Sequence, residues 1–424
     1  MDKSLYNNYV QILKEELVVA MGCTEPIAIA YAGAKAREIL GKKPEKVVIK
    51  CSGNIIKNVK CVTVPNTNGL VGIEASAITG ILAGDSTKEL EVISSVDEKY
   101  LDEIKALLDT NYCIVYLLDT PITLHIVLEV FSGDDSASVE IKQAHTNITK
   151  ITKNDEIIFS QDDADDKYLG VFVDRSILNV KDIYDFANNV NIDDVKYLLD
   201  NQIEKNLAIA KEGLKGTYGV GIGKVLLDSY TDNIDLKIKA YTSAASEARM
   251  GGSPMPVVTN SGSGNQGITV SIPLVIYASE KNIEKEKLYR ALVLSNLLAI
   301  HQKTLIGRLS AFCGAVSASC ASGAGITYLA GGNVKQIEDT ITNTLANTSG
   351  IVCDGAKISC GAKIASSLDG ALMGHHLAMA NQVYKPNTGI LKDTVEKTIN
   401  AVGRIGKDGM KQTDTEILNI MIDN

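Results

Sequence analysis

Two pairs of cysteines in the C-terminal half of the chain could bind metal. Cys313 and Cys320 form one C-x6-C pair, and Cys353 and Cys360 form the other. Zinc sites usually place two to four residues between paired ligands, so this spacing argues against zinc. On a straight helix, a step of seven residues returns a side chain to nearly the same face about 10 Å further along. A pair that binds one cluster therefore needs a break in the helix between its two cysteines.

The residues that follow Cys353 supply such a break. An Asp-Gly pair at 354–355 interrupts the helical pattern, whereas the residues between Cys313 and Cys320 continue it. Cys353 and Cys360 are therefore plausible joint ligands, and Cys313 and Cys320 are not expected to bind together. Thiolates of Cys313, Cys353 and Cys360 would hold three irons of a [4Fe–4S] cluster and leave the fourth iron free to act as a Lewis acid. The open alternative is that these cysteines are small buried residues that fill gaps in the core.

Two loops rich in Asn, Ser and Gly could bind an anion. Residues 64–78 read VPNTNGLVGIEASAI and residues 260–274 read NSGSGNQGITVSIPL, so each has a polar loop before a Gly-Ile and an apolar run. Such a loop places backbone N–H groups and short polar side chains at a helix N-terminus, where anions bind. Asn and Gly also form ordinary turns, and this alternative stays open.

The elements that must position these residues change along the chain. Residues 1–40 have the spacing of helices, and the pattern returns to helix from about residue 182. Between them, short β-branched segments predict strands, with a helix over 96–110. The predicted strands are 46–53, 89–96, 113–120, 124–133 and 138–153. The C-terminal half is rich in Ala, Gly and Ser, which predicts closely packed helices such as 284–304.

These patterns predict an α+β fold. We expect a mostly helical catalytic domain, formed by residues 1–45 and 200–424, that carries the cluster, and a smaller inserted α/β domain at 46–199. The insertion includes the acidic stretch SQDDADDKY, which we expect to face solvent and to support assembly into a homo-oligomer.

Composition excludes several classes of protein. The chain has 424 residues and 45% hydrophobic content, enough for two or three packed cores. Its formal net charge is -9 and it has no polybasic run, so we expect no nucleic-acid partner. It lacks a signal peptide and an apolar run of about 20 residues, which predicts a cytoplasmic protein without a membrane partner. The eight cysteines should therefore be reduced thiols.

Seven segments, taken in order, resemble the L-cysteine desulfidase family, which is related to the alpha chain of the iron–sulfur L-serine dehydratases. The resemblance runs from about residue 8 to residue 420. The segments are GCTEPIAIAYAGAKARE (22–38), SGNIIKN (52–58), VPNTNG (64–69), AASEARMGG (244–252), SGSGNQG (261–267), FCGAVSA (312–318) and GIVCDGAKISCGAK (350–363).

The resemblance implies a [4Fe–4S] enzyme without pyridoxal phosphate that cleaves L-cysteine by β-elimination to sulfide, ammonia and pyruvate. The family has three cluster cysteines with a long first gap and a second gap of seven, and this pattern carries over to Cys313, Cys353 and Cys360. The family's proposed proton acceptor, the cysteine of GCTEP, carries over to Cys23. Cys320 has no counterpart and is expected to be a packing residue.

The chemistry of these residue types agrees with that reaction. A thiol takes a proton from Cα only as a thiolate, and Cys23 precedes a helix start, where the pKa of a thiol is lowered. The open iron would bind the substrate sulfur as a Lewis acid. The carboxylate of the amino acid substrate needs an anion pocket, which the two polar loops could form. The expected substrate-binding residues are Asn66, Thr67, Asn68, Ser261, Ser263 and Asn265.

Other roles and other functions stay open. Glu25 could orient Cys23 or pair with a substrate ammonium, and Arg249 or Arg308 could meet the carboxylate or form a structural ion pair. The same scaffold could act on L-serine, because a hydroxyl also binds iron. A non-enzymatic iron–sulfur sensor or carrier is an alternative from another class. A pyridoxal-phosphate lyase is less favoured, because the sequence shows no persuasive lysine context.

Overall fold

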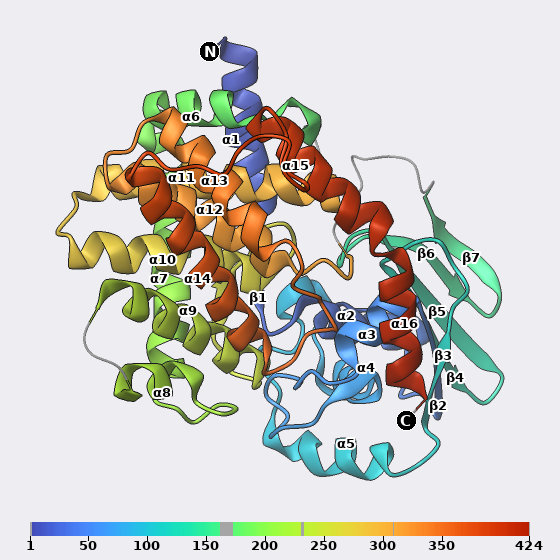
Figure 1. The fold of residues 1–424 in the computed structure, drawn as a ribbon. Helices are drawn as coiled ribbons and strands as arrows, with labels where there is room; N and C mark the ends of the chain where they lie inside the picture. Colours follow the sequence, from blue (N-terminus) through green and yellow to red (C-terminus); the bar gives the residue numbers. More distant parts are fainter. Residues whose placement is uncertain (1, 162–172, 230–232, 308, 424) are drawn as a thin grey trace.

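The computed structural model describes residues 2–161, 173–229, 233–307 and 309–423. Helices form one side of the molecule and a twisted sheet with its own helices forms the other (Figure 1). The predicted α+β class is confirmed. Arg308 and most of the acidic stretch at 160–168 lie outside the described residues.

The sheet has six strands within the described residues, in the order β3-β2-β4-β5-β6-β7. β2 and β3 are parallel, and the other neighbours are antiparallel. Alternate residues of β4, such as Ile126, Leu128 and Val130, are fully buried, as expected for a sheet with one covered face. The strands are β2 (Lys46–Cys51), β3 (Cys113–Leu117), β4 (His125–Ser132), β5 (Asp135–Lys142), β6 (Ile148–Lys153) and β7 (Glu156–Ser160).

Two predictions about strands were wrong. The segment 89–96 is not a strand, because residues 86–91 form a 3-10 helix capped by the Asp85 side chain. The segment 138–153 is not one strand but two, since β5 ends at Lys142 and β6 begins at Ile148 after a turn. Short turns of this kind are set by local side-chain bonds that a β-branched pattern does not reveal.

Helices α2 (Thr24–Leu40) and α4 (Gly72–Ala83) cover the buried face of the sheet and share its apolar core. A Cβ at Gly80 would lie 2.0 Å from the carbonyl oxygen of Ala30, so glycine permits this close contact. Three further helices accompany the sheet in the described residues: α3 (Gly53–Val59), α5 (Leu101–Leu108) and, at the C-terminus, α16 (Lys411–Ile422), which lies beside α3 (Figure 1).

The helical side is built around α10 (Gly264–Glu280), α11 (Lys285–Ile306) and α12 (Gly314–Leu329), which are buried on nearly all sides. Small residues bring these backbones together, as the composition predicts. The helices around them are α1 (Lys3–Glu16), α6 (Val180–Asn189), α7 (Lys196–Gly213), α8 (Ile222–Ser229), α9 (Ile234–Met250), α13 (Val334–Thr348), α14 (Cys360–Met379) and α15 (Val395–Arg404).

A short antiparallel pair connects the two sides. β1 (Val19–Met21) pairs with β8 (Pro256–Val258), and this pair leads directly into Cys23 on one strand and into the loop 259–263 on the other. The apolar residues of α1 pack in the helical core, whereas those of α2 pack in the sheet core. The predicted domain boundaries at 45 and 200 stay a prediction. Across the described residues, no helix has the length and apolar character that crossing a membrane requires.

Candidate functional site

The starts of several helices meet at one cavity between the two sides of the molecule. Cys23, Ser263 and Cys313 are the N-cap residues of α2, α10 and α12, and Cys360 is the first residue of α14. All four line a cavity of about 110 Å³. The N–H groups of a first helical turn have no partner inside the helix and carry partial positive charge. The cavity is therefore suited to negatively charged groups.

Backbone pairing brings Cys313 and Cys353 together. The N–H of Cys313 donates to the carbonyl of Ile351 (3.1 Å), and the N–H of Cys353 donates to that of Ala311 (2.7 Å). A hydrogen bond between the two side chains lowers the pKa of Cys353 and raises that of Cys313. Cys360 lies at the same cavity. The three predicted cluster ligands thus share one site.

The segment between Cys353 and Cys360 is irregular, as the Asp-Gly pair predicts. Asp354 forms ion pairs with Lys357 (2.5 Å) and with Lys363, and these hold the segment in a closed loop. Gly355 has a φ of 92°, a left-handed conformation that favours glycine. Cys320, by contrast, lies inside α12, fully buried, and is not part of the cavity wall.

The three cysteines are the donor type that an iron–sulfur cluster binds. No three His, Cys, Asp or Glu side chains of the described ranges converge on a point that could hold one ion. A cubane cluster makes a different demand, because each thiolate binds its own iron. Thiols spread over one cavity wall, at the positive ends of α12 and α14, meet that demand.

Cys23 lies close to a buried carboxylate. Its Sγ donates to Oε2 of Glu25 at 3.1 Å, and Glu25 also accepts from Thr24 Oγ1 (3.1 Å) and Asn58 Nδ2 (3.2 Å). Burial and the negative charge of Glu25 raise the pKa of Cys23 well above its ordinary value. The prediction of a lowered pKa for this thiol was therefore wrong, because burial and a carboxylate outweigh the helix N-terminus.

Glu25 itself is ionised. Burial alone would raise its pKa, but the charge of His145, the hydrogen bond from Cys23 and the charge of Arg249 together lower it. Lys303 is a further buried cation at the cavity. Burial lowers the pKa of Lys303, and the neighbouring thiols act in the opposite direction.

The loop before α10 is a tight turn with left-handed residues. The backbones of Asn260 and Ser263 exchange two hydrogen bonds (3.1 and 3.0 Å), and Ser261 and Gly262 have φ values of 52° and 74°. This is the pattern of a two-residue hairpin turn. Ser263 and Asn265 line the cavity, whereas Ser261 donates to Asn260 Oδ1 (2.9 Å) instead.

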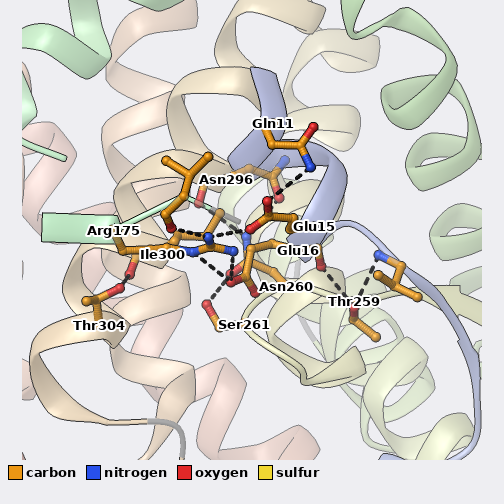
Figure 2. A network of polar contacts seen from close by, with 12 residues as sticks. Gln11, Glu15, Glu16, Arg175, Thr259, Asn260, Ser261, Asn296, Ile300 and Thr304 are labelled. Atoms are coloured by element: carbon orange, nitrogen blue, oxygen red, sulfur yellow. Dashed lines mark hydrogen bonds and ion pairs between the residues drawn. The ribbon is translucent and has the colours of Figure 1, made fainter. Parts of the chain in front are cut away.

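A buried network of hydrogen bonds and ion pairs holds the loop 259–263 in place (Figure 2). Asn260 Nδ2 donates to Asn296 Oδ1 (3.0 Å), and Thr259 Oγ1 donates to the carbonyl of Glu16 (3.1 Å). Glu16 in turn forms an ion pair with the buried Arg175 (2.9 Å). The network fixes a turn that contains an otherwise unfavourable left-handed serine.

The other predicted polar loop does not reach the cavity. Asn66 Nδ2 donates to the carbonyl of Ile93 (2.9 Å), and Thr67 Oγ1 donates to that of Val64 (2.7 Å). Asn66 and Asn68 have left-handed φ values of 61° and 53°. The described lining of the cavity includes none of Asn66, Thr67 and Asn68, and their role in substrate binding stays a prediction.

Comparison with known proteins decides the family. Residues 87–419 match the family model described as serine dehydratase alpha chain. The chain belongs to this family. The predicted relationship to the serine dehydratase alpha chains is thereby confirmed, and a preference for cysteine stays a prediction.

Relatives of similar length match nearly the whole chain. A "UPF0597 protein" of Lachnoclostridium phytofermentans is 51% identical over 420 residues, which cover 99% of this chain and 100% of the relative. One of Finegoldia magna is 50% identical over 421 residues (98% and 99%), and one of Porphyromonas gingivalis is 37% identical over 431 residues (99% and 99%). These names state no activity.

The lining residues with no role assigned from the sequence include Asn58, Gln266 and Lys303. Asn58 and Gln266 lie within SGNIIKN and SGSGNQG, so the family segments contained the signal. Lys303 lies near the end of α11, and no local pattern distinguishes it from the exposed lysines of the same helix.

Proposed function

We propose that the protein is a [4Fe–4S]-dependent, pyridoxal-phosphate-independent lyase that eliminates the β-substituent of an L-amino acid, with L-cysteine as substrate. The single observation that supports this most is the cavity that Cys23 shares with Cys313, Cys353 and Cys360. The serine dehydratase alpha chain family supports the same class of reaction.

Cys313, Cys353 and Cys360 would hold the cluster, and the starts of α12 and α14 would stabilise its negative charge. When bound through three protein thiolates, such a cluster supplies one Lewis-acidic iron for the leaving group of the substrate. Lys303 adds a buried positive charge beside Cys313 and Cys353. These side chains provide the donor set and the charge balance that the cofactor needs.

Cys23 would take the proton from Cα of the substrate. The thiol is protonated in the free protein, so it must first pass its own proton to Glu25, with which it is already hydrogen-bonded. Arg249 lowers the pKa of Cys23, and an ammonium group near the thiol would have the same effect. Substrate binding would thus favour formation of the thiolate.

Loss of the Cα proton and of hydrosulfide leaves an enamine that water converts to pyruvate and ammonia. Sulfide, ammonia and pyruvate are then formed in equal amounts. L-Serine is the second candidate substrate, and the family match favours it directly. With serine the leaving group is water, and the same Cα proton is removed.

The test is steady-state kinetics on anaerobically reconstituted protein, with iron and sulfide content measured in parallel. We expect release of sulfide with pyruvate and a higher kcat/KM for L-cysteine than for L-serine. A preference for serine would overturn the choice of substrate. Cys313→Ala, Cys353→Ala and Cys360→Ala should each lower the iron content, and full iron content in these variants would contradict the proposed ligands.

We also propose that the protein acts in the cytoplasm as a homo-oligomer. The edge strand β7 exposes Ile157, Ile158 and Phe159, which supports self-association, since exposed apolar edges tend to pair. Size-exclusion chromatography with light scattering gives the number of subunits. A monomer at micromolar concentration would contradict this part of the proposal.

A further inference from the structure

Several polar atoms in the cavity wall are buried and have nothing to bind. Nε of Arg249, Oδ1 of Asn58, Oδ1 of Asn265 and Oε1 of Gln266 all lack a hydrogen-bond partner among the described residues. All four residues line the cavity that holds Cys23. Leaving such atoms unpaired is costly, so they indicate a polar ligand.

Arg249, in the last turn of α9, lies against the start of α10. The residue is 2% exposed, and a Cβ at Gly264 would lie 2.3 Å from its Nε. Glycine at 264 therefore lets the guanidinium lie against the first turn of this 17-residue helix. The N–H groups of Gly264 and Asn265 come too early in the helix to bond a helical carbonyl. A guanidinium and a helix N-terminus side by side form a site for a carboxylate.

The remaining unpaired atoms are acceptors. The amide oxygens of Asn58, Asn265 and Gln266 are suited to the N–H groups of an ammonium. Gln266 is 6% exposed, and a Cβ at Gly314 would lie 2.7 Å from its Cδ, so a second glycine leaves room for this side chain. The ionised Glu25, which Asn58 contacts, adds a negative charge nearby.

We propose that this cavity recognises the zwitterion of an α-amino acid. Arg249 and the first turn of α10 bind the carboxylate, and the side-chain oxygens of Asn265 and Gln266 accept hydrogen bonds from the ammonium. The two groups of an amino acid are attached to one carbon, and the two sets of partners are adjacent in the chain at 264–266. This inference rests on the proposed function and names the substrate recognition that it requires.

Binding of three small probes tests the assignment. L-Alanine has both groups and no leaving group, L-lactate keeps the carboxylate without the ammonium, and ethylamine keeps the ammonium without the carboxylate. Calorimetric titration of the anaerobically purified protein should give the highest affinity for L-alanine. Arg249→Gln should lower the affinity for L-alanine and for L-lactate by about 10- to 100-fold and leave the affinity for ethylamine unchanged.

Gln266→Met should instead lower the affinity for L-alanine and for ethylamine about tenfold and leave the affinity for L-lactate unchanged. Arg404→Gln, which removes an exposed arginine of α15, is the matched control and should change none of the affinities. If Arg249→Gln does not fold, Arg249→Lys replaces it, because lysine keeps the charge but not the bidentate geometry. In this variant the affinities for L-alanine and L-lactate, the two probes with a carboxylate, should fall severalfold.

Unchanged L-alanine affinity in a folded Arg249 variant would overturn the proposal. An affinity for ethylamine that falls as much as the affinity for L-alanine in that variant would also overturn it. The outcome is separate from that of the proposed function, because alanine cannot undergo elimination. Specific L-alanine binding by a protein that releases neither sulfide nor pyruvate from L-cysteine would contradict the proposed reaction and leave the recognition site intact.

Discussion

The hydrogen bond between Cys23 and Glu25 governs the proton chemistry of the site at the scale of single residues. Glu25→Gln removes the acceptor of the thiol proton, and we expect kcat for elimination to fall about 100-fold or more. The same change should lower the pKa of Cys23, because the carboxylate charge that raises it is gone. Alkylation of Cys23 at mildly alkaline pH, followed by peptide mass spectrometry, should therefore become faster.

The control for this variant is Glu416→Gln, which changes an exposed glutamate of α16. It should leave both the kcat and the alkylation rate unchanged. If Glu25→Gln kept its full kcat, or if its Cys23 reacted more slowly, Glu25 would not be the proton partner of the thiol.

Lys303 links the site to the stability of the protein without cofactor. Its pKa is lowered in the folded protein, so between the folded and unfolded pKa values the unfolded chain binds more protons and stability rises with pH. Lys303→Met removes the buried amine and with it this pH-dependent contribution to the free energy of unfolding. We expect the variant to be more stable than wild type by about 1–3 kcal/mol near neutral pH, with the difference shrinking toward about pH 10.

Urea unfolding of the cluster-free protein at several pH values measures this difference. Lys287→Met, at an exposed position of the same helix, is the matched control and should show no such pH dependence. A loss of stability in Lys303→Met that is equal at all pH values would contradict the interpretation.

The closed loop between Cys353 and Cys360 is the element that spaces two of the proposed ligands. Gly355 is left-handed, and a Cβ there would lie 2.1 Å from the carbonyl oxygen of Lys57. Gly331 has a similar φ of 88° but no atom within 4 Å of a Cβ. Gly331→Ala should thus cost only the conformational strain, about 1 kcal/mol, and Gly355→Ala should cost about 2–4 kcal/mol. Denaturant unfolding of both variants measures the difference, and equal costs would show that the close approach does not matter.

The two ion pairs of Asp354 keep the same loop closed. In Asp354→Asn we expect the fold to remain and the iron content after reconstitution to fall to less than about half, because two ligands then lose their fixed spacing. Asp393→Asn breaks an exposed pair with Lys397 and should keep full iron content. Equal iron in the two variants would contradict a positioning role for Asp354.

At the scale of the whole molecule, the C-terminal helix ties the helical side to the sheet side. Asp414 of α16 pairs with Lys57 of α3, a lysine whose side chain is only 2% exposed. Asp414→Asn leaves that charge unpaired and should lower the free energy of unfolding by about 1–3 kcal/mol, less than for a fully buried pair because Asp414 is 20% exposed.

Hydrogen exchange should become faster across residues 411–422 in Asp414→Asn, because α16 loses its anchor. Asp408→Asn, which affects an exposed pair with Lys411, is the control and should change stability by less than about 0.5 kcal/mol. Unchanged exchange over α16 in Asp414→Asn would show that other contacts hold this helix in place.

Local patterns in the sequence determined much of this protein. Periodicity predicted the α+β class and most elements, and the Asp-Gly pair after Cys353 predicted the irregular loop, because backbone preferences act within a few residues. The failed strand at 89–96 and the single strand at 138–153 mark where side-chain caps and turns override such preferences.

Only the tertiary structure decided which residues share the cavity. It brought Cys23, Arg249 and Ser263 to Cys313 from distant parts of the chain, and it kept Asn66 and its neighbours away. It also reversed the expected pKa shift of Cys23, since the burial that raises this pKa most comes from the folded chain, although Glu25 is only two residues away. Contacts and desolvation are properties of the folded chain, and no local pattern encodes them.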